Sequence, residues 1–149
     1  MATTTATITI ASSDISDNSI SVSKTATLLK AGISTGLDQT SGLRRRTLAS
    51  VTPVDLIDLD HYQAQTLTEN KAAKVYIKNT GTSTANNVKV DIVSTGGTST
   101  EIGNLYGGDW MFFPYSAVWT SAASANNQDI VVTPSSANSV TLEYIIIYE

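Results

Sequence analysis

Apolar and polar residues alternate with a period of two in several segments of the chain. Residues two apart on an extended strand share a face, so each segment presents one apolar and one polar face. Threonine, valine and isoleucine supply many of these side chains, and their branched β-carbons suit a pleated strand. The pattern therefore predicts β-strands over residues 7–10, 20–23, 74–78, 88–92 and 140–144.

Glycine, asparagine and proline separate these segments at positions such as 79–81, 96–97, 107–108 and 133–135. These residue types supply the positive or fixed φ angles that tight turns require, and their spacing is typical of a sandwich or barrel. Residues 53–61 and 70–73 are the only helix candidates, but residues 54–60 fit a strand at least as well. We predict an all-β fold, an antiparallel β-sandwich with a jelly-roll-like arrangement and an extended N-terminal arm.

Aromatic residues are confined to the later part of the chain, because the first 61 residues contain no Phe, Trp or Tyr. Aromatic side chains bury large apolar areas and tend to dominate cores. We therefore assign residues 1–48 to an N-terminal extension with β-strands and residues 49–149 to the sandwich domain. The extension lacks bulk and is expected to lie on a companion molecule.

Two segments, residues 110–113 and 144–148, are apolar on both faces of a predicted strand. Either these strands lie deep in the sandwich or another subunit covers one of their faces. From the alternating and densest segments we predict six core residues, which are Val75, Ile77, Trp110, Phe112, Leu142 and Tyr144.

The composition restricts the function. Charged residues make up only 15% of the chain, against about 25% in typical soluble domains, so the surface is polar but weakly charged. The net charge of −4 argues against nucleic-acid binding, which requires a basic surface. The absence of cysteine excludes disulfides and thiolate metal sites. No apolar run has the length of a signal peptide or membrane span, so we expect synthesis in the cytoplasm and no membrane partner.

Four residues are candidates for contact with a protein partner: Arg44, Arg45, Arg46 and Trp119. The arginine triplet is either a solvated loop or edge, or a contact with an acidic partner, since guanidinium binds carboxylates in a bidentate manner. Trp119 follows Pro114 among small polar residues and is a candidate for an exposed anchor.

An acidic cluster at Asp55, Asp58 and Asp60, beside His61, contains oxygen ligands of the kind that bind Ca²⁺. No EF-hand glycine follows, so a solvated edge is the simpler interpretation and we predict no metal. His61 is the only histidine, and no cysteine or Gly-X-Ser-X-Gly motif accompanies it as a nucleophile. We predict no catalytic residues, no cofactor and no enzymatic activity.

Residues 74–79, 105–114, 129–134 and 142–149, with the stretches 2–13 and 30–43, resemble small virion structural proteins of tailed phages, marine phages especially. The resemblance implies a non-catalytic particle component in many copies, most simply a decoration (cement) protein of the head. Its expected partners are the major capsid protein or other virion proteins, its expected state is a homo-oligomer, such as a trimer, and its expected location is the virion.

The alternative is a tail, connector or fibre component that binds a receptor or carbohydrate, with Trp119 and Tyr106 or Tyr115 as the sugar platform.

Overall fold

The computed structural model describes residues 3–14, 19–30, 35–58, 72–94, 97–115 and 128–149. These residues form eleven β-strands and no helix, and every strand pairing is antiparallel. Because the described residues contain no helix, none of them forms an apolar helix long enough to cross a membrane. The predicted all-β, antiparallel sandwich is confirmed.

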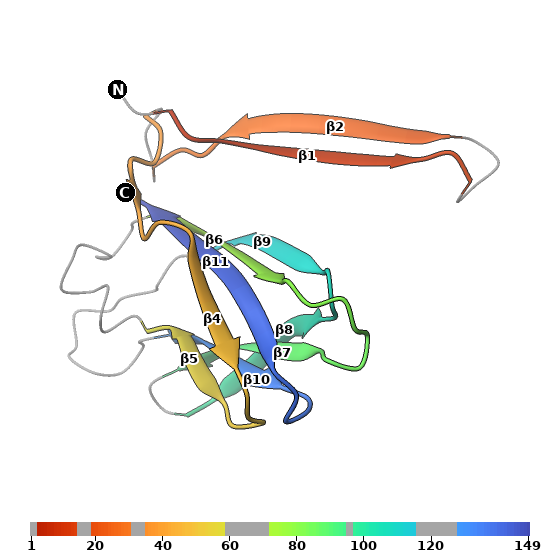
Figure 1. Cartoon of the computed structure of the whole chain (residues 1–149). Coiled ribbons are helices and arrows are strands. Elements are labelled where there is room, and N and C mark those ends of the chain that lie inside the picture. Colours follow the sequence, from red (N-terminus) through yellow and green to blue (C-terminus); the bar gives the residue numbers. More distant parts are fainter. Residues whose placement is uncertain (1–2, 15–18, 31–34, 59–71, 95–96, 116–127) are drawn as a thin grey trace.

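The strands make two facing sheets and a separate hairpin (Figure 1). The first sheet has the order β3-β11-β6-β9, and β4 pairs with β11 on the side of β3. Its strands are β3 (Gln39–Thr40), β4 (Arg44–Leu48), β6 (Ala73–Asn79), β9 (Trp110–Pro114) and β11 (Val140–Tyr148). The second sheet has the order β5-β10-β7-β8, with β5 (Val54–Ile57), β7 (Val88–Ser94), β8 (Ser99–Leu105) and β10 (Gln128–Pro134). The hairpin consists of β1 (Thr5–Ser12) and β2 (Ile20–Thr27).

The connections of the sandwich cross repeatedly from one sheet to the other. From β4 onward the chain changes sheet at every step except the hairpin from β7 to β8. This strand order is compatible with the predicted jelly-roll-like arrangement, which stays a prediction. All five segments predicted from alternation lie within strands, and residues 54–57 are a strand rather than a helix.

The core lies between the two sheets and is built by alternate residues of their central strands. Along β6 and β11 each second side chain is buried, as the period of two requires. The predicted core residues Val75, Ile77, Leu142 and Tyr144 all belong to this core, facing residues such as Val90 and Ile130.

Trp110 and Phe112 were predicted as core residues, and the structure corrects both. Strand β9 pairs with β6 so that Met111 lies opposite Ile77 and Phe113 opposite Val75. Met111 and Phe113 therefore pack against the core. The alternate residues Trp110 and Phe112 must point to the outer face, where Trp110 is 51% exposed and Phe112 is half-buried.

Asn79 fixes the loops at one end of the sandwich. Its side chain is fully buried, and its Nδ2 donates to the carbonyl oxygens of Asn86 (2.9 Å) and Leu105 (3.1 Å). Its Oδ1 accepts from the Gly81 amide at 3.0 Å. The neighbouring turn needs a glycine at position 107, because a Cβ there would lie 2.7 Å from the backbone of Ser83.

The N-terminal extension divides into two structurally different parts. Strands β3 and β4 lie within residues 1–48, yet both pair with β11 and so belong to the sandwich. Only the hairpin β1–β2 stands apart, and its distal end reaches well beyond the body of the molecule in Figure 1.

Candidate functional site

The hairpin β1–β2 has two chemically different faces. The pairing places Ile8 opposite Lys24 and Ile10 opposite Val22, and with Ala6, Ile20 and Ala26 these residues form its apolar face. Ile10 is 58% exposed and Val22 54% exposed. The opposite face carries hydroxyl groups, where Thr7 bonds Thr25 (2.7 Å) and Thr9 bonds Ser23 (3.1 Å). The strands β1 and β2 pack chiefly against each other, and an isolated two-stranded hairpin is only marginally stable in water.

The base of the hairpin is held by a small set of backbone and side-chain contacts. The Leu28 amide donates to the Thr4 carbonyl at 2.9 Å, and the Leu37 amide donates to the Leu28 carbonyl at 2.7 Å. Thr4 Oγ1 donates to the Leu37 carbonyl at 3.0 Å, and both leucines are buried. Lys30 and Asp38 form an ion pair of 2.6 Å beside them. Within the described residues, these contacts attach the hairpin at its base.

A second apolar surface lies on the outer face of the first sheet. We call it the outer-face patch, and it consists of Tyr76, Trp110, Phe112, Ile145 and Ile147. Tyr76 lies opposite Ile145 on one side and Phe112 on the other, and its ring centroid is 6.2 Å from that of Trp110. Burial, and next the charge of Glu143, raise the pKa of Tyr76.

The hairpin and the outer-face patch border a common cavity. This cavity has a volume of about 320 Å³ and is lined by Ala6, Thr7 and Ile8 of the hairpin and by Tyr76, Lys78, Trp110 and Phe112 of the sheet. The apolar face of the hairpin base therefore looks toward the patch without closing on it. Five of the ten exposed large hydrophobic residues in the described part of the chain lie on these two surfaces: Ile8, Ile10, Ile20, Val22 and Trp110.

The arginine triplet forms an edge strand, not a loop. β4 pairs with β11 through Arg44–Leu48, and charged edge strands discourage unwanted strand pairing. Arg45 points to the outer face, where its Nε and Nη2 donate to Glu143 Oε2 at 3.0 and 2.9 Å. Arg44 Nε donates to the Ser41 carbonyl at 3.2 Å, and Arg46 Nη1 donates to the Asp55 carbonyl at 2.6 Å.

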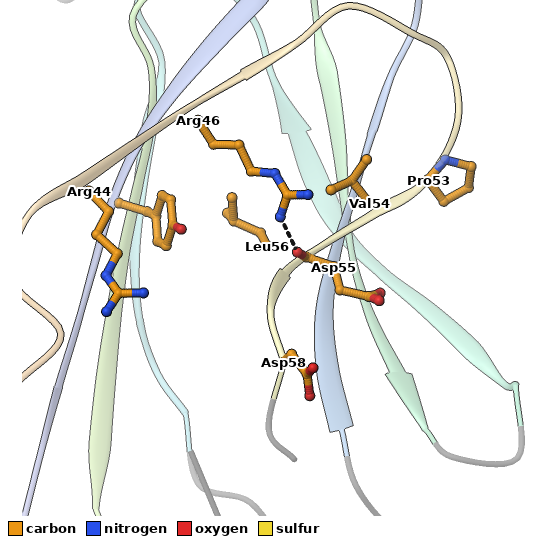
Figure 2. Close-up of a pocket in the computed structure, with 8 residues that line it drawn as sticks. Arg44, Arg46, Pro53, Val54, Asp55, Leu56 and Asp58 are labelled. Atoms are coloured by element: carbon orange, nitrogen blue, oxygen red, sulfur yellow. Dashed lines mark hydrogen bonds between the residues drawn. The ribbon is translucent and has the colours of Figure 1, made fainter. Parts of the chain in front are cut away.

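Arg44 and Arg46 line a second cavity, of about 570 Å³, at the open side of the sandwich between β4 and β5. Figure 2 shows the Arg46 guanidinium reaching the backbone of Asp55, with Asp58 farther along the same wall. Two cationic groups on one wall thus face two acidic residues on the other. Among the described residues that line this cavity there is no Ser, Thr, Cys or His, and its two carboxylates belong to Asp55 and Asp58.

The acidic cluster is described only in part. Asp55 is exposed on β5 and Asp58 follows that strand, whereas Asp60, His61 and Trp119 lie outside the described residues. No group of three or more metal-ligating side chains occurs in the part of the chain that the structure describes.

Tyr115 is buried, so its ring is not available for the expected sugar platform. Burial, and next the charge of Asp129, raise the pKa of the Tyr115 hydroxyl. Tyr106 is 47% exposed.

Sequence reasoning predicted an extension that lies on a companion molecule, but it identified neither the pairing of residues 5–12 with residues 20–27 nor the outer-face patch. The signal for the hairpin was present, because alternation without any aromatic residue predicts a strand that has little of its own to pack against. The signal for the patch was the doubly apolar segments, for which cover by another subunit was one of the two alternatives.

Comparisons with protein-family models and with curated proteins find no match. Among solved structures, the chain is similar to one from work on Bacillus endospore appendages, described as a novel family of disulfide-linked pili. The two chains are 16% identical, with a TM-score of 0.43, and the similarity covers 78% of this chain and 93% of that one. A likeness of this size assigns no function. This chain also has no cysteine with which to form such links.

Proposed function

We propose that this chain is a non-enzymatic structural protein of a phage particle, and specifically a decoration (cement) protein that binds the head surface in many copies. The hairpin β1–β2 is the observation that carries the proposal. It holds an apolar face in solvent, with Ile10 58% exposed, on a segment attached to the sandwich at its base. Exposed apolar surface of this kind marks interaction sites. The phage resemblance of the sequence supports the particle as the setting.

The mechanism is multivalent attachment to the major capsid protein or to other virion proteins. A single hairpin presents a small apolar face, so each contact is weak by itself. Repeated copies on one surface raise the effective concentration of every further contact, and the total attachment becomes strong without any single large interface. The protein would then be made in the host cytoplasm and function in the virion.

The arginine triplet is a weaker candidate for the same partner contact. Arg45 already pairs with Glu143, and Arg46 already donates to the Asp55 carbonyl. A partner carboxylate would have to compete with these interactions, whereas Ile10 and Val22 lose only their contact with water when they bind a partner. The hairpin is therefore the principal attachment element in this proposal.

The test is co-sedimentation with phage heads that lack this protein. Deletion of residues 1–27 removes the hairpin but keeps β3 and β4 in the sandwich. We expect this variant, and the double variant Ile10→Lys/Val22→Lys, to lose binding. Thr9→Lys/Ser23→Lys on the hydroxyl face is the matched control and should bind. Full binding by the deletion variant would refute the proposal.

A second candidate function is carbohydrate binding by a tail, connector or fibre component. The observation that favours it is the exposed Trp110 beside Tyr76, since aromatic rings on a surface serve as platforms for sugars as well as for proteins. Glycan-array binding that disappears in Trp110→Ala or in Trp119→Ala would support this role over head decoration.

A further inference from the structure

We propose that the hairpin β1–β2 of one copy docks on the outer-face patch of a second copy, so that the chain self-associates head to tail. This inference rests on the proposed structural function and names one partner of the hairpin, which is another copy of this chain. The contact joins two different surfaces, the apolar face of the hairpin and the patch of Tyr76, Trp110, Phe112, Ile145 and Ile147.

The direction of the hairpin is the first observation that supports this contact. Ala6 and Ile8 line the cavity above the patch, so the apolar face at the hairpin base is turned toward the sheet. Ile10 lies on the same face, because residues two apart on a strand share a face, and Val22 is its cross-strand partner. The distal half of the hairpin overhangs the molecule (Figure 1).

The incomplete cover of the outer-face patch is the second observation that supports this contact. The hairpin of the same chain borders the patch but leaves a cavity of about 320 Å³ between them. Trp110 stays 51% exposed at its rim. An apolar strand face from another molecule can fill this space, and the distal hairpin of a neighbouring copy carries such a face where its own sandwich cannot use it.

Charge does not select this contact, because Lys74 and Lys78 of β6 lie on the same outer face, opposite Ile147 and Trp110. Lys24 is the single cation on the apolar face of the hairpin, opposite Ile8. The sheet face next to the patch carries Glu143, whose Oε2 is bound by the largely exposed Arg45.

The area explains why the contact must be repeated. An eight-residue strand is about 27 Å long and paired strands lie about 4.8 Å apart, so a hairpin face covers roughly 300 Å². Burying it against a patch removes about 600 Å² from water in total, below the ~1,000 Å² of a stable interface. Each copy donates one hairpin and receives another, so each copy is held by two such contacts although the area buried stays at about 600 Å² per copy. The assembly closes into a ring or continues as an open array.

Sedimentation velocity of the purified full-length chain, without particles, tests the inference. We expect concentration-dependent self-association that weakens about tenfold or more in the hairpin variant Ile10→Glu/Val22→Glu and in the patch variant Trp110→Glu. The control Thr9→Glu/Ser23→Glu changes the hydroxyl face of the same strands and should associate like the wild type. All four changed side chains of the hairpin are exposed, so each variant should fold, which circular dichroism verifies.

Mixing the two defective variants identifies the type of contact. The hairpin variant keeps an intact patch and the patch variant keeps an intact hairpin, so an equimolar mixture should recover a dimer although neither variant associates alone. A contact between two hairpins would not recover in this way. Failure of the mixture to associate, or a wild-type chain that stays monomeric, overturns the inference.

Cysteine cross-linking separates a neighbour from the chain itself, because the native sequence has no cysteine. Chains with Ile10→Cys mixed with chains carrying Phe112→Cys should form a mixed disulfide. A disulfide that forms only within a single chain carrying both changes overturns the inference. If purified chains do not associate but the hairpin variant still loses binding to heads, the inference fails and the proposed function stands. If chains associate but never bind heads, the proposed function fails and the inference stands.

Discussion

The hairpin β1–β2 and the sandwich strand β6 share one sequence pattern but differ completely in burial. Both alternate apolar and polar residues, yet every second residue of β6 is buried whereas all residues of β2 are exposed. Strand β6 lies between β9 and β11 and faces a second sheet, and the hairpin has only its own two strands. Alternation thus identifies a strand with two unlike faces, but the presence of an opposing layer decides whether the apolar face is buried.

The most direct test of this comparison removes the same side-chain atoms in both regions. Ile77→Ala in β6 should lower the free energy of unfolding by about 2–5 kcal/mol, because Ile77 is fully buried and the change leaves a cavity. Ile10→Ala in β1 should change it by less than about 0.5 kcal/mol, since Ile10 is mostly exposed in the single chain. Urea unfolding at a concentration where the chain is monomeric measures both. Equal losses would show that the hairpin packs on its own sandwich.

The next prediction concerns how each region holds its loops. Asn79→Ala should lower the free energy of unfolding by about 1–3 kcal/mol, because it removes the hydrogen bonds that this fully buried side chain makes to Leu105 and Gly81. Asn104→Ala is the control, since Asn104 is exposed and its Nδ2 bonds the exposed Glu101. A neutral Asn79→Ala would mean that the hydrogen bonds of its side chain do not hold the loops at this end of the sandwich.

A third prediction contrasts a buried hydroxyl with the bonded hydroxyls of the hairpin. Tyr115 is buried, its hydroxyl has no hydrogen-bond partner among the described residues, and its pKa is raised above 10.0 mainly by burial. Above pH 10 the unfolded chain therefore loses this proton while the folded chain keeps it. The folded state binds more protons, so the free energy of unfolding falls as pH rises, by about 1.4 kcal/mol per pH unit for this group.

Tyr115→Phe should abolish that part of the alkaline loss and leave stability near neutral pH almost unchanged. Urea unfolding at neutral pH and above pH 10 checks both statements. An unchanged alkaline slope would show that Tyr115 titrates normally and is open to solvent, as the hydroxyl face of the hairpin is.

The smallest effect is expected for the ion pair on the outer face. Arg45 and Glu143 lie 2.9 Å apart, but the Arg45 side chain is 72% exposed. A double-mutant cycle with Arg45→Ala and Glu143→Gln should give a coupling free energy below about 1 kcal/mol. A coupling above about 2 kcal/mol would mean that this part of the outer face is covered, unlike the exposed hairpin.

Much of the fold follows from the sequence because the period of two is a local property. The segments 74–78, 88–92 and 140–144 are all strands, and Val75, Ile77 and Leu142 are core residues. The errors came where pairing decides orientation. Trp110 and Phe112 are apolar, but the register between β9 and β6 turns Met111 and Phe113 inward instead.

The candidate surfaces depend on longer-range information. Nothing local in Arg44–Leu48 shows that this segment pairs with a strand almost a hundred residues later, so its place in the sandwich was not predicted. The same holds for the patch, whose members come from three strands brought together by β6. The expected absence of enzymatic activity, the particle setting and the partner contacts of Arg44–Arg46 and Trp119 stay predictions.

The position of β11 has a consequence for how the molecule is made. This strand bonds β6 along one side and β3 and β4 along the other, so it occupies the middle of the first sheet. It is also the last of the described strands to leave the ribosome. The hairpin joins residues close in sequence and can form at once, whereas β4 has no partner until residues 140–148 emerge. Translation therefore completes the hairpin before the sandwich, and a nascent chain exposes the apolar face of the hairpin while its main sheet is still incomplete.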